Sequence, residues 1–353
     1  TTRLDFRRRF YYEDSANPEW GHGGEVRRRH NQTYEWQFDN ILSWNKEFGS
    51  HRIAATGLVN AERNQSWYTD ARNSNLQPTE ALGYHGIGYG INPIVGSDDQ
   101  ATTRTALMGR VNYSYSNRYN LSASIRQDGY SRFGENFVHA TFPSVSAAWT
   151  ISNEGFMADR PAWMEFLKLR ASWGVNGNSS GHSSYAAYSN LRRSKLLNWS
   201  GGYFRVNRLT VGRIANPNLA WEKNDAFNFA IDYGFFNGRL RGSLDVYSSS
   251  TTDLLLNKKL SIVKGFEEIT TNVGNLKNTG FDLAINTINI QNQNFTWSSS
   301  LNVSYNKNEI VSLTGELVED ENGNLVEPDD YDNGWFIGEN KDVIWNFEMG
   351  EVY

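Results

Sequence analysis

Strict alternation of apolar and polar residues is the dominant pattern of this chain. Between residues 227 and 235 the odd positions are Phe, Phe, Ile, Tyr and Phe, and the even positions are Asn, Ala, Asp and Gly. After Asn237 and Gly238, which favour a turn, the alternation resumes over residues 239–246. A period of two is that of a β-strand, because successive side chains point to opposite faces. The pattern predicts a sheet with one apolar, aromatic face and one charged face.

The same pattern recurs along the whole chain and predicts an all-β fold of about eleven antiparallel strands. The predicted strands cover residues 3–12, 33–46, 51–64, 105–116, 119–128, 141–151, 167–175, 224–235, 239–254, 272–288 and 294–310. Short connections (47–50, 116–118, 236–238, 289–293) alternate with long ones (13–32, 65–104, 129–140, 176–223, 255–271, 311–334). The longer connection 152–166 falls on the short side, and we expect a helical turn there, capped by Ser152 or Asn153. Transmembrane β-barrels sort their short turns and long loops to opposite ends in this way.

The two faces of the predicted sheet can be assigned from residue type. The predicted outward, lipid-facing set is apolar and comprises Leu107, Val111, Tyr113, Tyr115, Leu121, Ala123, Ile125, Val145, Ala147, Trp149, Ile151, Leu167, Leu169, Ala171, Trp173, Phe281, Leu283, Ile285, Trp297, Leu301, Val303 and Tyr305. The predicted inward, lumen-lining set is charged and comprises Arg110, Arg126, Lys168, Arg170, Asp232, Arg239, Arg241, Asp245 and Asp282. A Lys or Arg facing lipid at mid-membrane costs roughly 2–4 kcal/mol, so these charges indicate the wet face. A soluble sheet with one solvated face is the alternative.

Composition supports a wet lumen and aromatic membrane interfaces. Hydrophobic residues are only 39% of the chain, whereas 12 Trp, 18 Tyr and 19 Phe raise the aromatic share to 14%. No run approaches the roughly 18 apolar residues of a membrane-spanning helix. The first residues, TTRLDFRRRF, lack the apolar segment of a signal peptide, and they begin inside a predicted strand. We therefore expect the chain to be a portion of a longer protein.

Charge argues against nucleic acid as a partner. The net charge is −5, whereas nucleic-acid binding usually requires a basic surface. The runs Arg7-Arg8-Arg9 and Arg27-Arg28-Arg29 are local, and we expect them to be solvated or to lie at a loop rim.

Several ordered motifs carry a family resemblance. They are RQDGYSRFG (126–134), FPSVSAAW (142–149), SNEGFM (152–157), KLRASWGVNGN (168–178), NPNLAWEKN (216–224) and TNVGNLKNTGFDLAINT (271–287). In this order and spacing they resemble the barrel of SusC/RagA-type TonB-dependent transporters of the Gram-negative outer membrane. The chain departs from the family pattern at Tyr130, where Ser is usual, and at Asp282, where Glu is usual. The match is clearest over residues 105–353, and the first hundred residues resemble the family only in their strand-and-loop style.

The resemblance implies that residues 1–353 form part of a barrel of about 22 strands with a plug in its lumen, as in outer-membrane transporters of this size. It implies active import of oligosaccharides or peptides, driven through the TonB complex, which would act on a plug region that this chain lacks. A SusD-like surface lipoprotein would be the partner on the long-loop side, and outer-membrane lipid would surround the wall. It implies neither catalytic residues nor a cofactor.

No enzyme or metal constellation stands out in the sequence. There is no cysteine, and the six histidines do not form a close ligand pair. In the acidic segment 318–334, Asp320, Asn322 and Asn324 imitate the first ligands of a calcium loop, but the required Gly and closing Glu are missing. We predict an ordinary external loop there.

Aromatic residues in the predicted long loops are the candidates for ligand contact. Flat rings with polar neighbours suit stacking on sugars or contact with a peptide backbone. The candidates are Trp67, Tyr68, Tyr84, Tyr89, Trp199, Tyr203 and Phe204. Loop anchoring and membrane-girdle placement explain such rings equally well.

Two other functions stay open from the residues alone. One is a secreted all-β carbohydrate-binding module of the lectin or adhesin kind, which would use the same loop aromatics. The other is a β-rich glycoside hydrolase, which needs two carboxylates about 5–10 Å apart. Glu222, Glu267, Asp98 and Asp99 are available for the hydrolase, although nothing in their spacing favours a pair.

Overall fold

The computed structural model describes residues 2–13, 24–76, 81–180, 183–194 and 208–345, except residues 262, 264 and 267. The chain divides into two compact units, residues 1–40 with 59–106 and residues 41–58 with 107–353. Among the described residues, no helix has the length and apolar character needed to cross a membrane.

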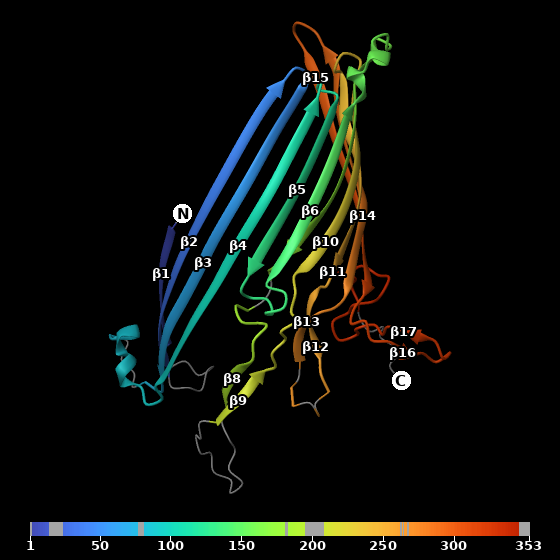
Figure 1. Cartoon of the computed structure of the whole chain (residues 1–353). Helices are drawn as coiled ribbons and strands as arrows, with labels where there is room; N and C mark the ends of the chain where they lie inside the picture. The colour runs from blue at the N-terminus through green and yellow to red at the C-terminus, as the bar shows by residue number, and fades with distance from the viewer. Residues whose placement is uncertain are drawn as a thin grey trace. The chain divides into compact units, whose positions relative to one another are not determined.

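Eleven long strands form one antiparallel sheet in which chain order is also spatial order, with β7 followed by β10 and β11 by β14 (Figure 1). The strands are β1 (Thr2–Glu13), β2 (Glu25–Phe48), β3 (His51–Ser74), β4 (Ile94–Tyr115), β5 (Tyr119–Tyr130), β6 (His139–Thr150), β7 (Met164–Asn178), β10 (Glu222–Phe235), β11 (Leu240–Thr252), β14 (Asn275–Gln291) and β15 (Thr296–Ser312). All eleven predicted strands are therefore confirmed, and so is the all-β class.

The first unit holds β1, the parts of β2 to β4 within residues 25–40, 59–74 and 94–106, and the 3-10 helix η1 (Gly83–Tyr89). Strands β2, β3 and β4 are each 10 residues longer than predicted. They have 24, 24 and 22 residues, whereas 14, 14 and 12 were predicted. In these added stretches polar residues occupy both faces, so the apolar alternation fades while the backbone pairing continues. Arg27 on β2 and Asp70 on β3 help to hold this extension through two hydrogen bonds of 2.9 and 2.7 Å.

The second unit holds the remaining strands and their sorted connections. The turns β2–β3, β4–β5, β6–β7, β10–β11 and β14–β15 lie at one end, and the loops β5–β6, β7–β10 and β11–β14 lie at the other (Figure 1). The tight β10–β11 turn has three consecutive residues with positive φ, namely Phe236, Asn237 and Gly238 (56°, 53° and 78°), as its Asn-Gly pair favours. The predicted separation of short turns from long loops is confirmed for this unit.

The longer β6–β7 connection differs from prediction in its capping. It contains the 3-10 turns η2 (Ile151–Asn153) and η3 (Gly155–Met157), whose N-cap residues are Thr150 and Glu154 and form no side-chain cap. Capping by Ser152 or Asn153 is therefore wrong, because both lie inside η2. Glu154 instead clasps the turn by accepting hydrogen bonds from Tyr119, Trp149 and Arg118, and these bonds lower the pKa of its carboxyl group.

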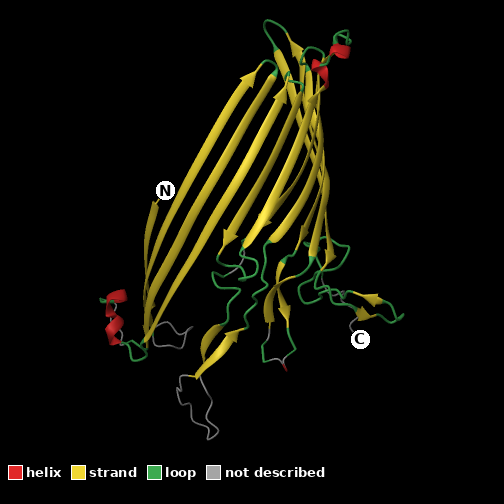
Figure 2. Cartoon of the chain, in the orientation of Figure 1, coloured by secondary structure: helices red, strands yellow, loops and turns green. Residues whose placement is uncertain are grey.

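Six short strands were not predicted, and each pairs within a long connection. They form three two-stranded sheets: β8 (Asn190–Ser194) with β9 (Arg208–Arg213), β12 (Leu255–Lys259) with β13 (Glu268–Asn272), and β16 (Val318–Glu319) with β17 (Leu325–Val326) (Figure 2). Each is only two to six residues long, which is too short for an alternating pattern to stand out. The predicted loops are thus partly built of small hairpins.

A buried aromatic cluster joins the loops of the second unit. Tyr130, Phe133, Phe142, Leu219 and Trp221 are its large members, and Ala186 and Ala187 complete it. Trp221 donates a hydrogen bond of 3.2 Å from Nε1 to the carbonyl of Val138. Most of these residues belong to the motifs that carried the family resemblance. The motifs therefore supply the side chains that pack together where the long loops leave the sheet.

Candidate functional site

The strand register gathers charged side chains on one face of the second unit. Asp232 of β10 lies opposite Lys168 of β7 and Ser243 of β11, and Asp245 of β11 lies opposite Asp282 of β14. Partners in register share a face. The apolar face is continuous as well, since Phe229 is opposite Ala171 and Val246, and Val246 is opposite Phe281. The register therefore keeps the predicted charged and apolar sets on separate faces.

Arg170 is the centre of an ion-pair network on the charged face. Its Nε and Nη2 donate to the two carboxylate oxygens of Asp232, each at 2.8 Å, in a bidentate pair. Nη2 also donates to Asp245 at 3.3 Å. The Arg170 side chain is 36% exposed, and the two aspartates are 23% and 21% exposed. Its charge is thus shared between two half-buried carboxylates, and the bidentate pair fixes the orientation of the planar guanidinium.

The other predicted lumen-lining residues make local contacts. Arg126 forms a bidentate pair with Asp128 at 2.7 and 2.8 Å, and Arg241 lies 3.3 Å from Glu165. The remaining members behave similarly: Arg110 donates to Asn112 at 3.2 Å, and Asp282 accepts from Ser304 at 2.5 Å. Arg239 belongs to the turn before β11 and not to a strand, because its N–H bonds back to the carbonyl of Phe236.

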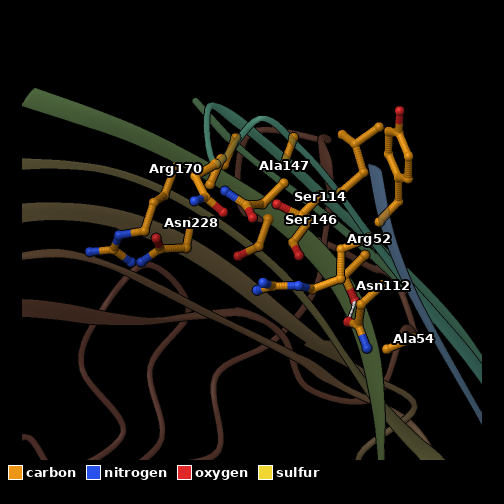
Figure 3. A pocket seen from close by; sticks show the side chains of 16 residues that line it. Arg52, Ala54, Asn112, Ser114, Ser146, Ala147, Arg170 and Asn228 are labelled. Carbon is orange, nitrogen blue, oxygen red and sulfur yellow. Dashed lines mark hydrogen bonds between the residues drawn. The ribbon is translucent and has the colours of Figure 1, made fainter. Parts of the chain in front are cut away.

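A concavity of about 520 Å³ opens between the inward polar side chains of β3 to β7 and β10 (Figure 3). Arg52, Asn112, Ser146, Arg170 and Asn228 line it and come from five strands. Hydroxyl and amide groups dominate, and several bond across strands, as Ser122 does to Asn112 at 2.8 Å. Such a surface offers many neutral donors and acceptors and no nucleophile with an activating base. Its chemistry is that of reversible hydrogen bonding to a polar solute.

The predicted loop aromatics separate into three groups. Trp67 and Tyr68 lie within β3 and not in a loop, so their predicted loop location is wrong. Strand β3 extends past them to Ser74, between β2 and β4 in the sheet. Tyr84 and Tyr89 belong to η1, and Tyr89 is 65% exposed. Trp199, Tyr203 and Phe204 lie outside the described residues. Their contact with ligand stays a prediction.

Two of these rings have intramolecular partners in the first unit. The Arg29 guanidinium lies 4.2 Å from the centroid of the Tyr68 ring, and Tyr84 stacks on Phe10 at 4.8 Å. Phe10 was missed by sequence reasoning, since it reads as one more apolar position of a strand. Its position opposite Arg28 of β2 sets Phe10 apart from the other apolar residues of β1, and this pairing is visible only in the structure.

Among the carboxylates considered for hydrolysis, Asp98 and Asp99 are neighbours on one strand and therefore point to opposite faces. Asp98 and Asp99 belong to β4 in the first unit, and Glu222 begins β10 in the second. Glu222 accepts a hydrogen bond from Asn178 at 3.1 Å, and Glu267 lies outside the described residues.

Asp320 has a structural role in the β16–β17 hairpin. Its carboxylate accepts the backbone N–H groups of Asn324 and Asn322 at 2.8 and 2.9 Å, and these bonds lower its pKa. Within the described part of the chain, no group of three or more His, Cys, Asp or Glu could hold a metal ion.

Comparison with known proteins gives a consistent family. Residues 1–338 match the model of the TonB dependent receptor-like β-barrel. TonB-dependent receptor P26 of Formosa agariphila is 34% identical in an alignment of 318 positions that covers 85% of this chain and 30% of that protein. TonB-dependent receptor SusC of Bacteroides thetaiotaomicron is 36% identical over 217 residues, which are 60% of this chain and 21% of SusC. The chain thus spans less than a third of the length of these relatives.

Solved structures agree on the fold. The structure of the RagAB peptide transporter superposes with a TM-score of 0.78 over 96% of this chain and 36% of that one, at 24% identity. The ferric citrate transporter FecA gives a TM-score of 0.51 over 88% of this chain at 10% identity. Both superpositions match the fold of the eleven-stranded sheet to part of a transporter barrel.

Proposed function

The chain belongs to the TonB-dependent receptor β-barrel family, and on that premise we propose that it forms part of the wall of an outer-membrane importer of nutrients. The full protein would lie in the outer membrane of a Gram-negative bacterium and draw its energy through TonB. This chain would supply wall, lumen surface and external loops. Members of this family transport solutes and do not break bonds, so no catalytic residue is assigned and the hydrolase is set aside.

The separation of the two sheet faces carries the proposal. Apolar side chains such as Leu121, Ile125 and Val145 are exposed on one face, where a soluble protein would have to hide them. The opposite face carries the Arg170 network and the polar concavity. Lipid outside and water inside satisfy both faces at once. A secreted binding module would leave the apolar face in water, which disfavours that alternative.

Peptides and oligosaccharides are the proposed substrate classes. Both present many amide or hydroxyl groups and few charges, which matches a lumen face of Ser, Asn and internally paired Arg. The loop aromatics, above all the exposed Tyr89, are proposed to contact ligand at the long-loop end. The RagAB transporter is named for peptides, and the SusC/RagA resemblance includes glycan importers, so both classes belong in the test.

A surface lipoprotein of the SusD type is proposed as the partner. The SusC/RagA resemblance of the barrel motifs supports this, and the structure of the RagAB peptide transporter shares the barrel fold. The partner would sit over the long loops, and TonB would engage the opposite side through the plug region of the full protein.

Uptake by cells tests the proposed function. The gene for the full-length protein is deleted, and uptake of fluorescent oligopeptides and oligosaccharides is compared with the parent strain and with a complemented strain. We expect one substrate class to lose uptake on deletion, to regain it on complementation, and to lose it again when the proton gradient is collapsed. Unchanged uptake of both classes, or recovery of the protein in the soluble fraction, would contradict the proposal.

A further inference from the structure

The outward face of β1 and β2 in the first unit changes character along the strands. Leu4, Phe6 and Tyr34 are exposed apolar residues on one face, and Leu4 is opposite Tyr34 in the register. Further toward the β1–β2 connection the next pairs on the same face are Arg8 with His30 and Phe10 with Arg28. An apolar, lipid-facing band therefore passes directly into a basic patch, which we define as Arg8, Arg28 and His30 with Phe10.

The two arginines of the basic patch have no acidic partner among the described residues. Arg8 is exposed, and it is the diagonal neighbour of Arg28, a relation that places backbones about 7–8 Å apart. The Arg28 guanidinium lies 5.6 Å from the centroid of the Phe10 ring, and its Nε is shielded from solvent without a hydrogen-bond partner. An orphaned cationic donor is costly, so a ligand that brings negative charge would stabilise it.

Neighbouring arginines on the inward face are satisfied within the protein. Arg27 is held by Asp70, Arg7 lies 3.2 Å from Asp5, and Arg29 covers the Tyr68 ring at 4.2 Å. Because side chains alternate along a strand, each run of three arginines is split between the two faces. Arg7, Arg27 and Arg29 thus have a partner within the protein, whereas Arg9, the fourth inward arginine of the two runs, is exposed. On the outward face, by contrast, neither Arg8 nor Arg28 has an acidic partner among the described residues.

We propose that the basic patch binds the phosphate groups of an outer-leaflet lipid headgroup. This inference rests on the proposed membrane location and goes beyond the proposed import function. The patch lies toward the long-loop end, where the strands leave the lipid and enter the headgroup layer. Arginine matches phosphate with two parallel hydrogen bonds, and the diagonal pair can address one headgroup together. Phe10, stacked on Tyr84 at 4.8 Å, forms a flat aromatic base at the same level.

The occupant follows from continuity with the lipid face. The basic patch begins where the exposed apolar band of Leu4 and Phe6 ends. A soluble anion makes no contact with the apolar band, so the band would not favour its binding. A phosphorylated lipid satisfies both parts, since its acyl chains cover the band and its phosphate reaches the arginines.

Lipid titration of the full-length protein tests the inference. The protein is purified in detergent and titrated with phosphorylated lipid A, with dephosphorylated lipid A of the same acyl composition, and with inorganic phosphate. We expect the phosphorylated lipid to bind most tightly. The R8Q and R28Q variants should each weaken its binding about fivefold, and the double variant about 25-fold, because each surface arginine contributes modestly to anionic lipid binding. Binding of the dephosphorylated lipid should not change.

The matched control removes the same charge from the inward face. The R7Q/R9Q variant changes the two arginines of β1 that flank Arg8, and it should keep the affinity for phosphorylated lipid A. Equal loss in the control and in R8Q/R28Q, equal affinity for the two lipids, or saturable binding of inorganic phosphate alone would overturn the inference. Fractionation of the same variants separates this result from the import proposal, because an outer-membrane location with no lipid preference contradicts the inference alone.

Discussion

Arg170 illustrates how single residues keep a charged face stable inside a membrane protein. Its guanidinium forms ion pairs with both Asp232 and Asp245, while Asp282, opposite Asp245, accepts a hydrogen bond from Ser304. Without it, two neighbouring carboxylates on adjacent strands would repel each other. The charge balance of this face therefore depends on a single arginine.

We expect R170Q to lower the stability of the full-length barrel by about 1 kcal/mol, a modest cost because the pair is partly exposed to water. The midpoint of urea unfolding in detergent measures it. R110Q is the matched control, because Arg110 donates to Asn112 and removing it leaves no carboxylate unpaired. Equal shifts in the two variants would show that the network adds nothing to stability.

Gly177 and Gly134 stand where neighbouring atoms leave no room for a methyl group. A Cβ at Gly177 would meet the Phe142 ring at 2.1 Å, and a Cβ at Gly134 would meet the carbonyl oxygen of Pro217 at 2.0 Å. We expect G177A to lower the free energy of unfolding by about 1–3 kcal/mol through overpacking. G109A is the control, since nothing lies within 4 Å of a Cβ at Gly109. A barrel in which both substitutions are equally tolerated would contradict the packing of the buried aromatic cluster.

At the scale of elements, small hairpins and side-chain clasps organise the long connections. Glu327, just after β17, accepts the backbone N–H groups of Leu313, Thr314 and Gly315 and the hydroxyl group of Ser312. One carboxylate thereby accepts the hydrogen bonds of four donors at the end of β15. Burial by itself would raise the pKa of Glu327, but the donors from Gly315, Ser312, Thr314 and Leu313 outweigh it and lower the pKa.

The sign of this shift predicts acid loosening of the β15–β16 connection. Because the folded pKa is depressed, the clasp contributes fully above the ordinary glutamate pKa of 4.5 and is lost as pH falls below that value through the folded pKa. Hydrogen-exchange protection factors for residues 313–315 should therefore decrease toward acid pH. E327Q should abolish this dependence, whereas E319Q in β16 should retain it. Protection that is independent of pH in the unsubstituted protein would argue against the clasp.

At the scale of the whole molecule, the sheet has two free edges. Among the described residues, β1 pairs only with β2 and β15 only with β14 in the eleven-stranded sheet. Unpaired backbone groups cannot face lipid, so the sheet needs further strands to close.

We expect the isolated chain to aggregate when refolded with detergent, and the full-length protein to give a barrel that resists unfolding in SDS until it is heated. The mobility of heated and unheated samples on a gel measures the difference. A heat-modifiable, monomeric band from the isolated chain would contradict the need for partner strands.

Much of the fold follows from alternation alone, because a sheet with one apolar and one polar face repeats the same pattern in every strand. The eleven strands, the sorted connections and the separation of Lys168, Asp232 and Asp245 from the apolar set were all predictable from period and register. The extended parts of β2 to β4 were not, since polar residues on both faces remove the pattern while hydrogen bonding continues. Trp67 and Tyr68 were misplaced for that reason.

The sequence by itself determined which residues share a face, because side-chain alternation is a local property of an extended backbone. It also determined the family, through motifs that pack the loop bases around Trp221. Only the tertiary structure decided which charges meet. Arg170 and Asp245 are 75 residues apart in the chain, and their contact depends on the register of three strands. The same holds for Arg28, whose lack of an acidic partner is a property of its neighbours in space and not of the arginine run that contains it.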